Sequence, residues 1–341
     1  MTTLWDTNGG EVVKALSAER RAAGAVAFGL VLTLVVVVDE RHAKEAMGVA
    51  AEGAAAHPCR LLVVVRRAPD AAEPRLDAEV SVGGGLGTGE SVVLRMQGPL
   101  ASHAESVVLP LLAPDAPVVT WWYGAPPDRV GDDCLGALAD RRITDSAAAP
   151  DPVAALQQRA ADYTPGDTDL AWTRITHWRS LLAATFDSVS GTPTGAEVSA
   201  EPGNPSAELL AGWLAARLGV TVPVETSAGP GLTGVALRFD GGNGGGTVRL
   251  DRPDGRTARL ARSDQPDRIL PLPRRQLGDL IGEELRRLDP DEPYADALAT
   301  AAGRPTAGGA GTADRPRRRP TAIERQGEEA AGRRLGSGAA T

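Results

Sequence analysis

The chain has few of the residues that cross-linked or metal-stabilised folds require. Its 341 residues include two cysteines, Cys59 and Cys134. Two thiols are too few for a disulfide scaffold, and the segment His57-Pro58-Cys59 does not have the ligand spacing of a structural zinc site. We therefore expect no metal and a reducing, cytoplasmic environment.

Membrane-spanning and signal segments are missing as well. The most apolar run, residues 26–38, contains Thr33 and stops at Asp39. It is shorter than a membrane span and typical of a fully buried strand. Residues 1–10 are polar and do not form a charged-then-apolar signal pattern. These features predict a soluble intracellular protein with no membrane partner.

Lysine is almost absent, since Lys14 and Lys44 are the only two, and Arg carries the remaining positive charge. The net charge is -8, while residues 303–341 hold eight Arg and four acidic residues, so the preceding part of the chain is more acidic than the whole. An acidic body argues against nucleic acid and anionic membranes as partners.

The order of apolar and polar segments predicts two folded units. Residues 1–190 read as an α/β domain with a mixed sheet and helices on the sheet faces. Residues 191–205 are rich in Ser, Gly, Thr and Pro and read as a linker, apart from a possible strand at 196–200. Residues 206–302 predict a smaller α+β domain with a mostly antiparallel sheet. Residues 303–341 lack large apolar side chains and read as a disordered tail.

The individual elements follow from the periodicity of apolar residues. The expected helices cover residues 11–23, 40–56, 102–113, 134–139, 153–161, 169–187, 206–218, 274–288 and 293–301. The expected strands cover residues 26–38, 60–66, 76–82, 90–96, 118–123, 141–144, 196–200, 221–225, 232–239, 247–251, 257–261 and 268–272.

Two glycine clusters, residues 83–89 and 241–246, do not match a phosphate-binding loop. Neither has the G-x-x-x-x-G-K-[ST] pattern, and each joins two strand-like segments where a helix N-terminus would be needed. Both are interpreted as hairpin turns, which glycine favours. The chain also lacks a G-x-S-x-G motif, and its four histidines lie in four different settings. We predict no catalytic residues and no cofactor.

Two short motifs have alternative interpretations. His57-Pro58-Cys59-Arg60 is either a turn that leads into a buried strand or one side of a ligand crevice at a strand end. Trp121 and Trp122 are adjacent on a strand, so their side chains point to opposite faces. Either helices cover both faces, or another protein covers one of the two indoles.

Residues 163–179 concentrate aromatic and charged side chains, and from residue 169 on they belong to the predicted helix 169–187. With Thr168 as the N-cap, a helical wheel places Trp178 on an apolar stripe that faces the core. The wheel places Trp172 and Arg179 on one flank, and Arg174 and His177 on the other. These flanks are either a contact surface for a partner or a seam between the two domains.

Several of these motifs, in this order, closely resemble the actinobacterial family of glucose-6-phosphate dehydrogenase assembly proteins, OpcA. The similarity extends from residue 1 to about residue 298. The segments that carry it are His57-Pro58-Cys59-Arg60 and residues 103–112, 115–122, 140–146, 163–179, 201–205 and 250–255.

The resemblance implies a non-catalytic protein that binds glucose-6-phosphate dehydrogenase and promotes its active oligomer in the oxidative pentose phosphate pathway. Our hypothesis is that one set of aromatic and basic residues contacts the dehydrogenase. The set is Trp121, Trp122, Trp172, Arg174, His177 and Arg179.

Two other functions stay open. One is an enzyme or sensor for a sugar phosphate, with an anion site formed by His57, Arg60, Arg141 and Arg142. The other is a scaffold that stabilises the dehydrogenase without changing its turnover.

Overall fold

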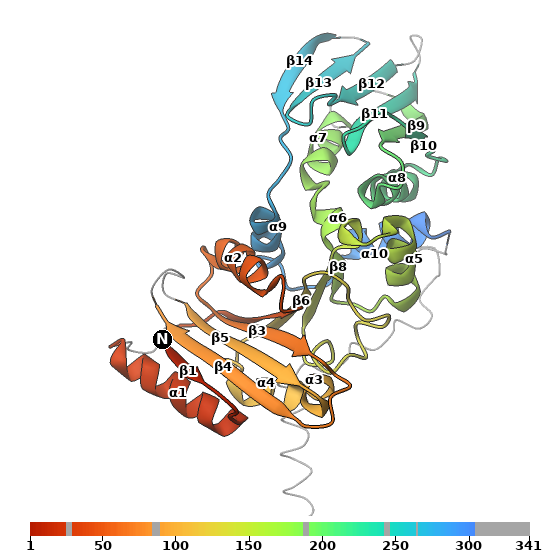
Figure 1. Ribbon diagram of the computed structural model, residues 1–341. Helices are drawn as coiled ribbons and strands as arrows, with labels where there is room; N and C mark the ends of the chain where they lie inside the picture. Colours follow the sequence, from red (N-terminus) through yellow and green to blue (C-terminus); the bar gives the residue numbers. More distant parts are fainter. Residues whose placement is uncertain (25–28, 84–88, 187–190, 242–245, 264, 304–341) are drawn as a thin grey trace, which may run out of the picture.

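The computed structural model describes residues 1–24, 29–83, 89–186, 191–241, 246–263 and 265–303, which form two sheets with helices between and around them (Figure 1). The first sheet has eight strands in the order β1-β4-β5-β3-β2-β6-β7-β8. They span Thr2–Leu4 (β1), Arg75–Val82 (β4), Glu90–Gln97 (β5), Cys59–Arg67 (β3), Leu32–Val38 (β2), Val118–Trp122 (β6), Arg141–Thr144 (β7) and Asp167–Asp169 (β8).

This sheet is mixed, as predicted. The strands from β5 to β8 are parallel to their neighbours, and β1 and β4 add an antiparallel edge. The seven residues of β2 are all buried, which explains their unbroken apolar sequence. The predicted hairpin is confirmed, because β4 and β5 pair from Arg75 and Gln97 to Val82 and Glu90.

Helices cover both faces of the sheet. One face packs against α1 (Gly9–Ala22), α3 (Pro99–Ser102), α4 (Glu105–Val108) and the short helix Leu109–Leu111. The other face packs against α2 (Ala43–Ala54) and α9 (Leu277–Glu284), which lie side by side in Figure 1. The predicted helix at 102–113 is instead two short helical pieces, α4 and Leu109–Leu111, and the second contains Pro110 in its first turn.

The packing of α9 corrects a prediction, because residues 274–288 were expected to close the second domain. Glycines on both helices allow the close contact with α2. A β-carbon on Gly53 would lie 2.8 Å from Cγ2 of Ile281, and one on Gly278 would lie 2.6 Å from Cδ of Glu52. The long-range partner of an amphipathic helix is not encoded in its own periodicity.

The second sheet has six strands in the order β10-β9-β11-β12-β13-β14, and all pairs except β9 with β10 are antiparallel. They span Val224–Thr226 (β10), Thr192–Ala200 (β9), Leu232–Asp240 (β11), Gly246–Asp251 (β12), Thr257–Arg262 (β13) and Gln265–Pro271 (β14). Residues 191–205 are thus not simply a linker, since β9 is an inner strand. A Thr- and Ser-rich strand can satisfy its backbone between two neighbours as well as an apolar one.

The core of this second unit includes five helices: α5 (Pro152–Asp162), α6 (Leu170–Thr173), α7 (Thr176–Phe186), α8 (Pro205–Leu218) and α10 (Glu292–Ala301). The predicted helix 169–187 is divided into β8, α6 and α7, and its first turn is capped by Asp169 instead of Thr168. Residues 134–139, predicted as a helix, form turns. A β-carbon on Gly136 would lie 1.8 Å from the carbonyl oxygen of Val130, so the backbone passes close to its neighbour there.

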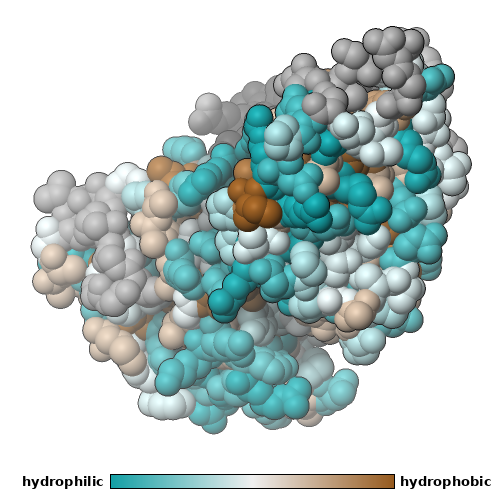
Figure 2. Space-filling model, turned by 90° about the horizontal axis from the view of Figure 1, so that it is seen from above, coloured by the Kyte–Doolittle hydropathy of each residue, from teal (hydrophilic) through white to brown (hydrophobic). Residues whose placement is uncertain are grey.

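Most of strand β14 faces the solvent, and Ile269 within it is 67% exposed. Figure 2 looks onto the end of the molecule that carries this sheet, and the coloured surface is mainly hydrophilic with small, separate hydrophobic patches. The predicted tail, apart from Gly303, lies outside the described residues.

Candidate functional site

The carboxyl edge of the parallel strands is the place where open α/β sheets bind their ligands. Strands β2 and β6 are neighbours here, although β3, β4 and β5 lie between them in the sequence. The loop after β2 carries Asp39 and His42, Tyr123 follows β6, and Asp145 follows β7. This edge therefore gathers polar side chains from three strands.

The chemistry of this edge is acidic. His42 Nδ1 lies 2.8 Å from Asp39 Oδ1, and its ring centroid is 6.0 Å from that of Tyr123. Burial, together with a hydrogen bond to Glu45, raises the pKa of Tyr123 to about 12. The turn between β2 and α2 holds Asp39 and Glu40 and has no glycine. A dinucleotide-binding turn needs glycine and a positive potential at this point, so the edge does not suit a nucleotide phosphate.

The three arginines of the predicted anion site, which also includes His57, are not free to bind an anion. Arg60, Arg141 and Arg142 begin their strands at the amino edge of the sheet, opposite the ligand-binding edge. Each is at most 5% exposed and already bonded to a carboxylate. Arg60 donates to Glu90 at 2.8 Å, Arg141 to Glu284 at 2.9 Å, and Arg142 pairs with Asp167. Arg60 and Arg142 join the starts of neighbouring strands, and Arg141 joins β7 to α9, so these guanidiniums do not form the predicted anion site.

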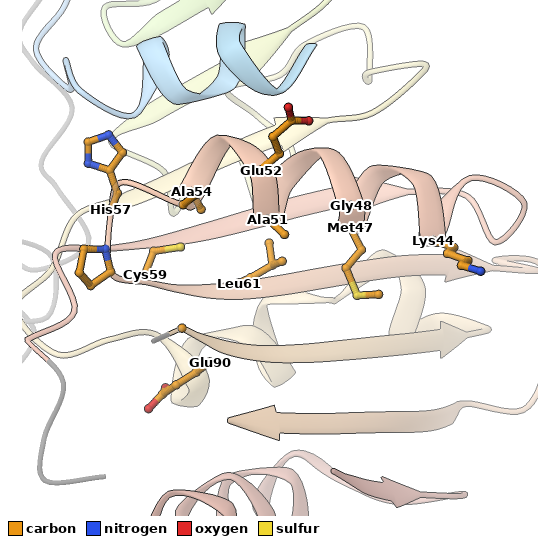
Figure 3. Close-up of a pocket in the computed structure, with 13 residues that line it drawn as sticks. Lys44, Met47, Gly48, Ala51, Glu52, Ala54, His57, Cys59, Leu61 and Glu90 are labelled. Carbon is orange, nitrogen blue, oxygen red and sulfur yellow. The ribbon is translucent and has the colours of Figure 1, made fainter. Parts of the chain in front are cut away.

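His57 lies in a groove of about 670 Å³ between α2 and the strands β3 and β5 (Figure 3). The side chains of Met47, Ala51 and Leu61 make its wall and floor largely apolar. Nε2 of His57 is buried without a hydrogen-bond partner among the described residues. Cys59, at the groove floor, is 4% exposed, and burial raises the pKa of its thiol to about 11. A protonated thiol is a poor nucleophile.

Trp121 and Trp122 point to opposite faces of β6, as predicted. Trp122 packs in the core under α1 and α4, and Trp121 packs in the core under α2 and α9. Both are 1% exposed, so other parts of the same chain cover both indoles. Neither can contact a partner on the surface of this structure, and the prediction that they do is wrong.

Trp172 is also inside the molecule, since 1% of it is exposed. Its Nε1 donates to Asp291 Oδ2 at 2.9 Å, and the guanidinium carbon of Arg179 lies 3.5 Å from the ring centroid. Trp178 belongs to the second core, as predicted. Trp172 and Arg179 share a flank, as the helical wheel predicted, but that flank is covered by the same chain, so the prediction that Trp172 contacts a partner is wrong.

The other flanking residues are more accessible. Arg174 is partly buried and makes two bonds to Asp145, at 2.6 and 2.7 Å. Arg179 is partly buried, and His177 is exposed. His177 is therefore the one member of the predicted contact set that solvent reaches freely.

The predicted segment forms a seam between the two units, which was the second interpretation of its flanks. Glu284 accepts hydrogen bonds from Arg141 and from Thr173, the latter at 2.6 Å. Glu283 accepts one from Thr176 at 2.7 Å and pairs with Arg275 at 2.5 Å. These contacts join β7, α6 and α7 to α9. The only local sign of these acidic partners is the charged face of the amphipathic helix predicted at 274–288.

The described ranges 1–24, 29–83, 89–186, 191–241, 246–263 and 265–303 contain neither a metal-binding cluster nor a membrane-spanning helix. No group of three His, Cys, Asp or Glu side chains there could hold a metal ion. No helix there is long and apolar enough to cross a membrane.

Comparison with known proteins adds family information to this geometry. Residues 50–161 match a family model described as the N-terminal domain of a glucose-6-phosphate dehydrogenase subunit, and residues 165–298 match the model of its C-terminal domain. Both models carry the family name OpcA.

Two cyanobacterial relatives are each described as a putative OxPP cycle protein OpcA. The one from Synechocystis is 30% identical over 203 residues, which are 55% of this chain and 42% of the relative. The one from Synechococcus elongatus is 32% identical over 139 residues, which are 38% of this chain and 31% of the relative. The matched region thus spans less than half of either relative.

Among solved structures, a variant of KijD10, a 3-ketoreductase from Actinomadura kijaniata, is similar over 80% of this chain and 95% of its own. The TM-score is 0.44 and the identity 13%, which is too distant a likeness to indicate function.

Proposed function

Because this chain belongs to the OpcA family, we propose that it is a non-catalytic partner of glucose-6-phosphate dehydrogenase. In this proposal it acts in the cytoplasm, promotes the active oligomer of the dehydrogenase, and so raises entry into the oxidative pentose phosphate pathway. One observation carries the proposal: models of both domains of a dehydrogenase subunit match the chain in the correct order.

The geometry of the first sheet supports a binding role over a catalytic one. Its ligand-binding edge is lined by Asp39, Asp145 and a tyrosine whose pKa is raised. The three arginines of the predicted anion site, Arg60, Arg141 and Arg142, start their strands at the opposite edge and are paired with carboxylates. An activator needs no chemistry of its own. A preference of about 1.4 kcal/mol for the active oligomer would shift its population tenfold.

Trp5 is the residue we assign to the centre of the contact. Four of the six tryptophans are 1% exposed, whereas Trp5, which follows edge strand β1, is 69% exposed. Interface hot spots are enriched in tryptophan. His177 stays in the proposed contact set. Trp172 is left out of the set because it is buried in the seam, where it contacts Asp291 and Arg179.

Titration of the purified chain into the purified dehydrogenase tests the function. An activator raises the initial rate of NADPH formation at saturating substrate and shifts the dehydrogenase to a larger species in sedimentation velocity. A scaffold leaves the initial rate unchanged and lengthens the lifetime of activity. The proposal fails if the sedimentation profile and the initial rate both stay constant when the chain is in excess.

Trp5→Ala tests the contact. Loss of a hot-spot tryptophan costs 2 kcal/mol or more, so we expect binding to weaken by roughly 30-fold or more. The melting temperature should stay near that of the wild type because the side chain is mostly in water. Ile269→Ala, at a position 67% exposed on the other sheet, is the matched control. Equal binding by the two variants would place the contact elsewhere.

A further inference from the structure

A second cavity, of about 520 Å³, lies in the seam between the two units. Helices α7, α8 and α10, and the segment at the end of α9, contribute its walls. Its aromatic residues are Trp172 and Trp213, and its most accessible cations are Arg179, Arg286 and Arg287. Volumes of this size are typical of sites for small molecules.

Arg179 is presented to this cavity with most of its donors unused. Its guanidinium stacks on Trp172, and Nη2 donates to Thr176 Oγ1 at 3.1 Å. Its Nε is buried and has no hydrogen-bond partner among the described residues. Burial lowers the pKa of Arg179 to about 10, so the group is still a cation at neutral pH. A buried donor without a partner is costly, which favours a ligand that accepts from it.

The carboxylates around the cavity already have other partners. Glu284 is bonded to Arg141 and Thr173, and Glu283 to Thr176 and Arg275. Asp291 uses both oxygens at the start of α10. Oδ2 accepts from the Trp172 indole, and Oδ1 accepts from a backbone N–H. None of the three forms an ion pair with Arg179 in the described structure.

Arg286 and Arg287 add positive charge to the lining of the cavity. Both lie in the turn that follows α9, and both are exposed. Neither side chain has a hydrogen-bond or ion-pair partner within the described ranges. Three arginines thus line one cavity whose carboxylates already have other partners.

We propose that this cavity binds a small phosphate monoester, with Arg179, Arg286 and Arg287 around the phosphate and Trp213 beside the organic part. A phosphate dianion matches several guanidiniums better than a single carboxylate does, and the planar fork of arginine binds its oxygens in pairs. The ligand would touch helices from both units, so its binding stabilises the seam. The inference is independent of the dehydrogenase contact.

Isothermal titration calorimetry of the full chain tests the site. The probes are glucose 6-phosphate and inorganic phosphate at constant ionic strength, with glucose and succinate as neutral and dicarboxylate controls. We expect glucose 6-phosphate to bind with a Kd below about 1 mM, inorganic phosphate to bind more weakly, and neither control to bind detectably.

Arg286→Ala combined with Arg287→Ala should weaken glucose 6-phosphate binding at least tenfold and leave the fold intact, since both side chains are in solvent. The matched control is Arg256→Ala with Arg268→Ala, two exposed arginines near the second sheet. It removes the same charge and should bind like the wild type. Arg179→Lys keeps the charge but removes the planar fork, and should also weaken binding.

Four results would overturn the proposal. They are no binding heat at millimolar glucose 6-phosphate, equal weakening by the two double variants, tighter binding of succinate than of phosphate, and equal binding of glucose. Activation of the dehydrogenase by the Arg286 and Arg287 variant is measured in parallel. Intact activation with lost glucose 6-phosphate binding would leave both proposals standing, because the two surfaces are separate.

Discussion

Replacement of Trp172 offers the sharpest check on how the seam is built. The side chain is 1% exposed, fills space in the second core, and is the platform for Arg179. Truncation of a buried tryptophan to alanine costs about 3–5 kcal/mol. The loss of the stacked guanidinium adds about 0.5–2 kcal/mol. Against a total stability of about 5–15 kcal/mol, Trp172→Ala should leave the protein barely folded at 25 °C.

Trp172→Phe separates the ring from its hydrogen bond. Phenylalanine keeps most of the apolar contact and a face for Arg179, but leaves Asp291 Oδ2 without its donor. We expect a loss of about 1–3 kcal/mol, between wild type and Trp172→Ala. Trp5→Ala, a replacement in solvent, should change stability by less than about 0.5 kcal/mol.

Urea unfolding followed by far-ultraviolet circular dichroism measures all three variants on the same scale. Circular dichroism is preferred to fluorescence because each variant removes a tryptophan. The reasoning is refuted if Trp172→Ala loses less than about 1 kcal/mol, or if Trp5→Ala loses as much as Trp172→Ala. Either result would mean that Trp172 is not packed as the structure shows.

Three further predictions concern packing, charge and thiol chemistry. Gly53→Ala should lower the melting temperature because its β-carbon would lie 2.8 Å from a side-chain atom of α9. The control is Gly48→Ala in the same helix, whose β-carbon meets nothing within 4 Å and which should be neutral or stabilising by up to about 1 kcal/mol. Equal changes in melting temperature would contradict the contact between α2 and α9. Burial acts to raise the pKa of Glu90, but hydrogen bonds from two arginines outweigh it, so the pKa is lowered in the folded protein. The Glu90 carboxylate therefore stabilises the fold fully above about pH 4.5, its usual pKa, and this contribution is lost as the pH falls through the lowered folded-state pKa. Urea unfolding should therefore show Glu90→Gln less stable than wild type at pH 7, with the difference shrinking in acid; a constant difference would be evidence against the linkage. Cys59 should react with Ellman's reagent at pH 8 far more slowly than a free thiol, because burial raises its pKa to about 11, and rapid labelling of the native protein would show an accessible thiolate.

Local patterns predicted the parts of this fold whose partners are near in sequence or fixed by periodicity. The apolar runs of β2 and β3 have the composition of buried parallel strands, and the alternation in β4 and β5 predicts their hairpin. Adjacent tryptophans on β6 had to occupy opposite faces, and they do. In each case the deciding constraint acts over a few residues.

The candidate site was harder to predict because its partners are distant in sequence. Trp172 is bonded to an acid 119 residues later, and Arg141 to one 143 residues later. A helical wheel shows which residues share a flank, but not whether another helix covers that flank. The arginines at the strand starts were predicted to bind an anion for the same reason. The carboxylates that pair with them are distant in the sequence, so local patterns do not show the pairing.

The return of α9 to α2 also bears on how the chain is made. The face of the first sheet that holds Trp121 is completed by Leu280, Ile281 and Leu285. A ribosome synthesises these residues after nearly all of the second unit, at about 5–20 residues per second. The side of α2 that binds α9, including Gly53, is therefore exposed to water for many seconds before α9 is synthesised. During this interval the exposed apolar face can bind chaperones that recognise hydrophobic surface. The synthesis and docking of α9 then cover the face.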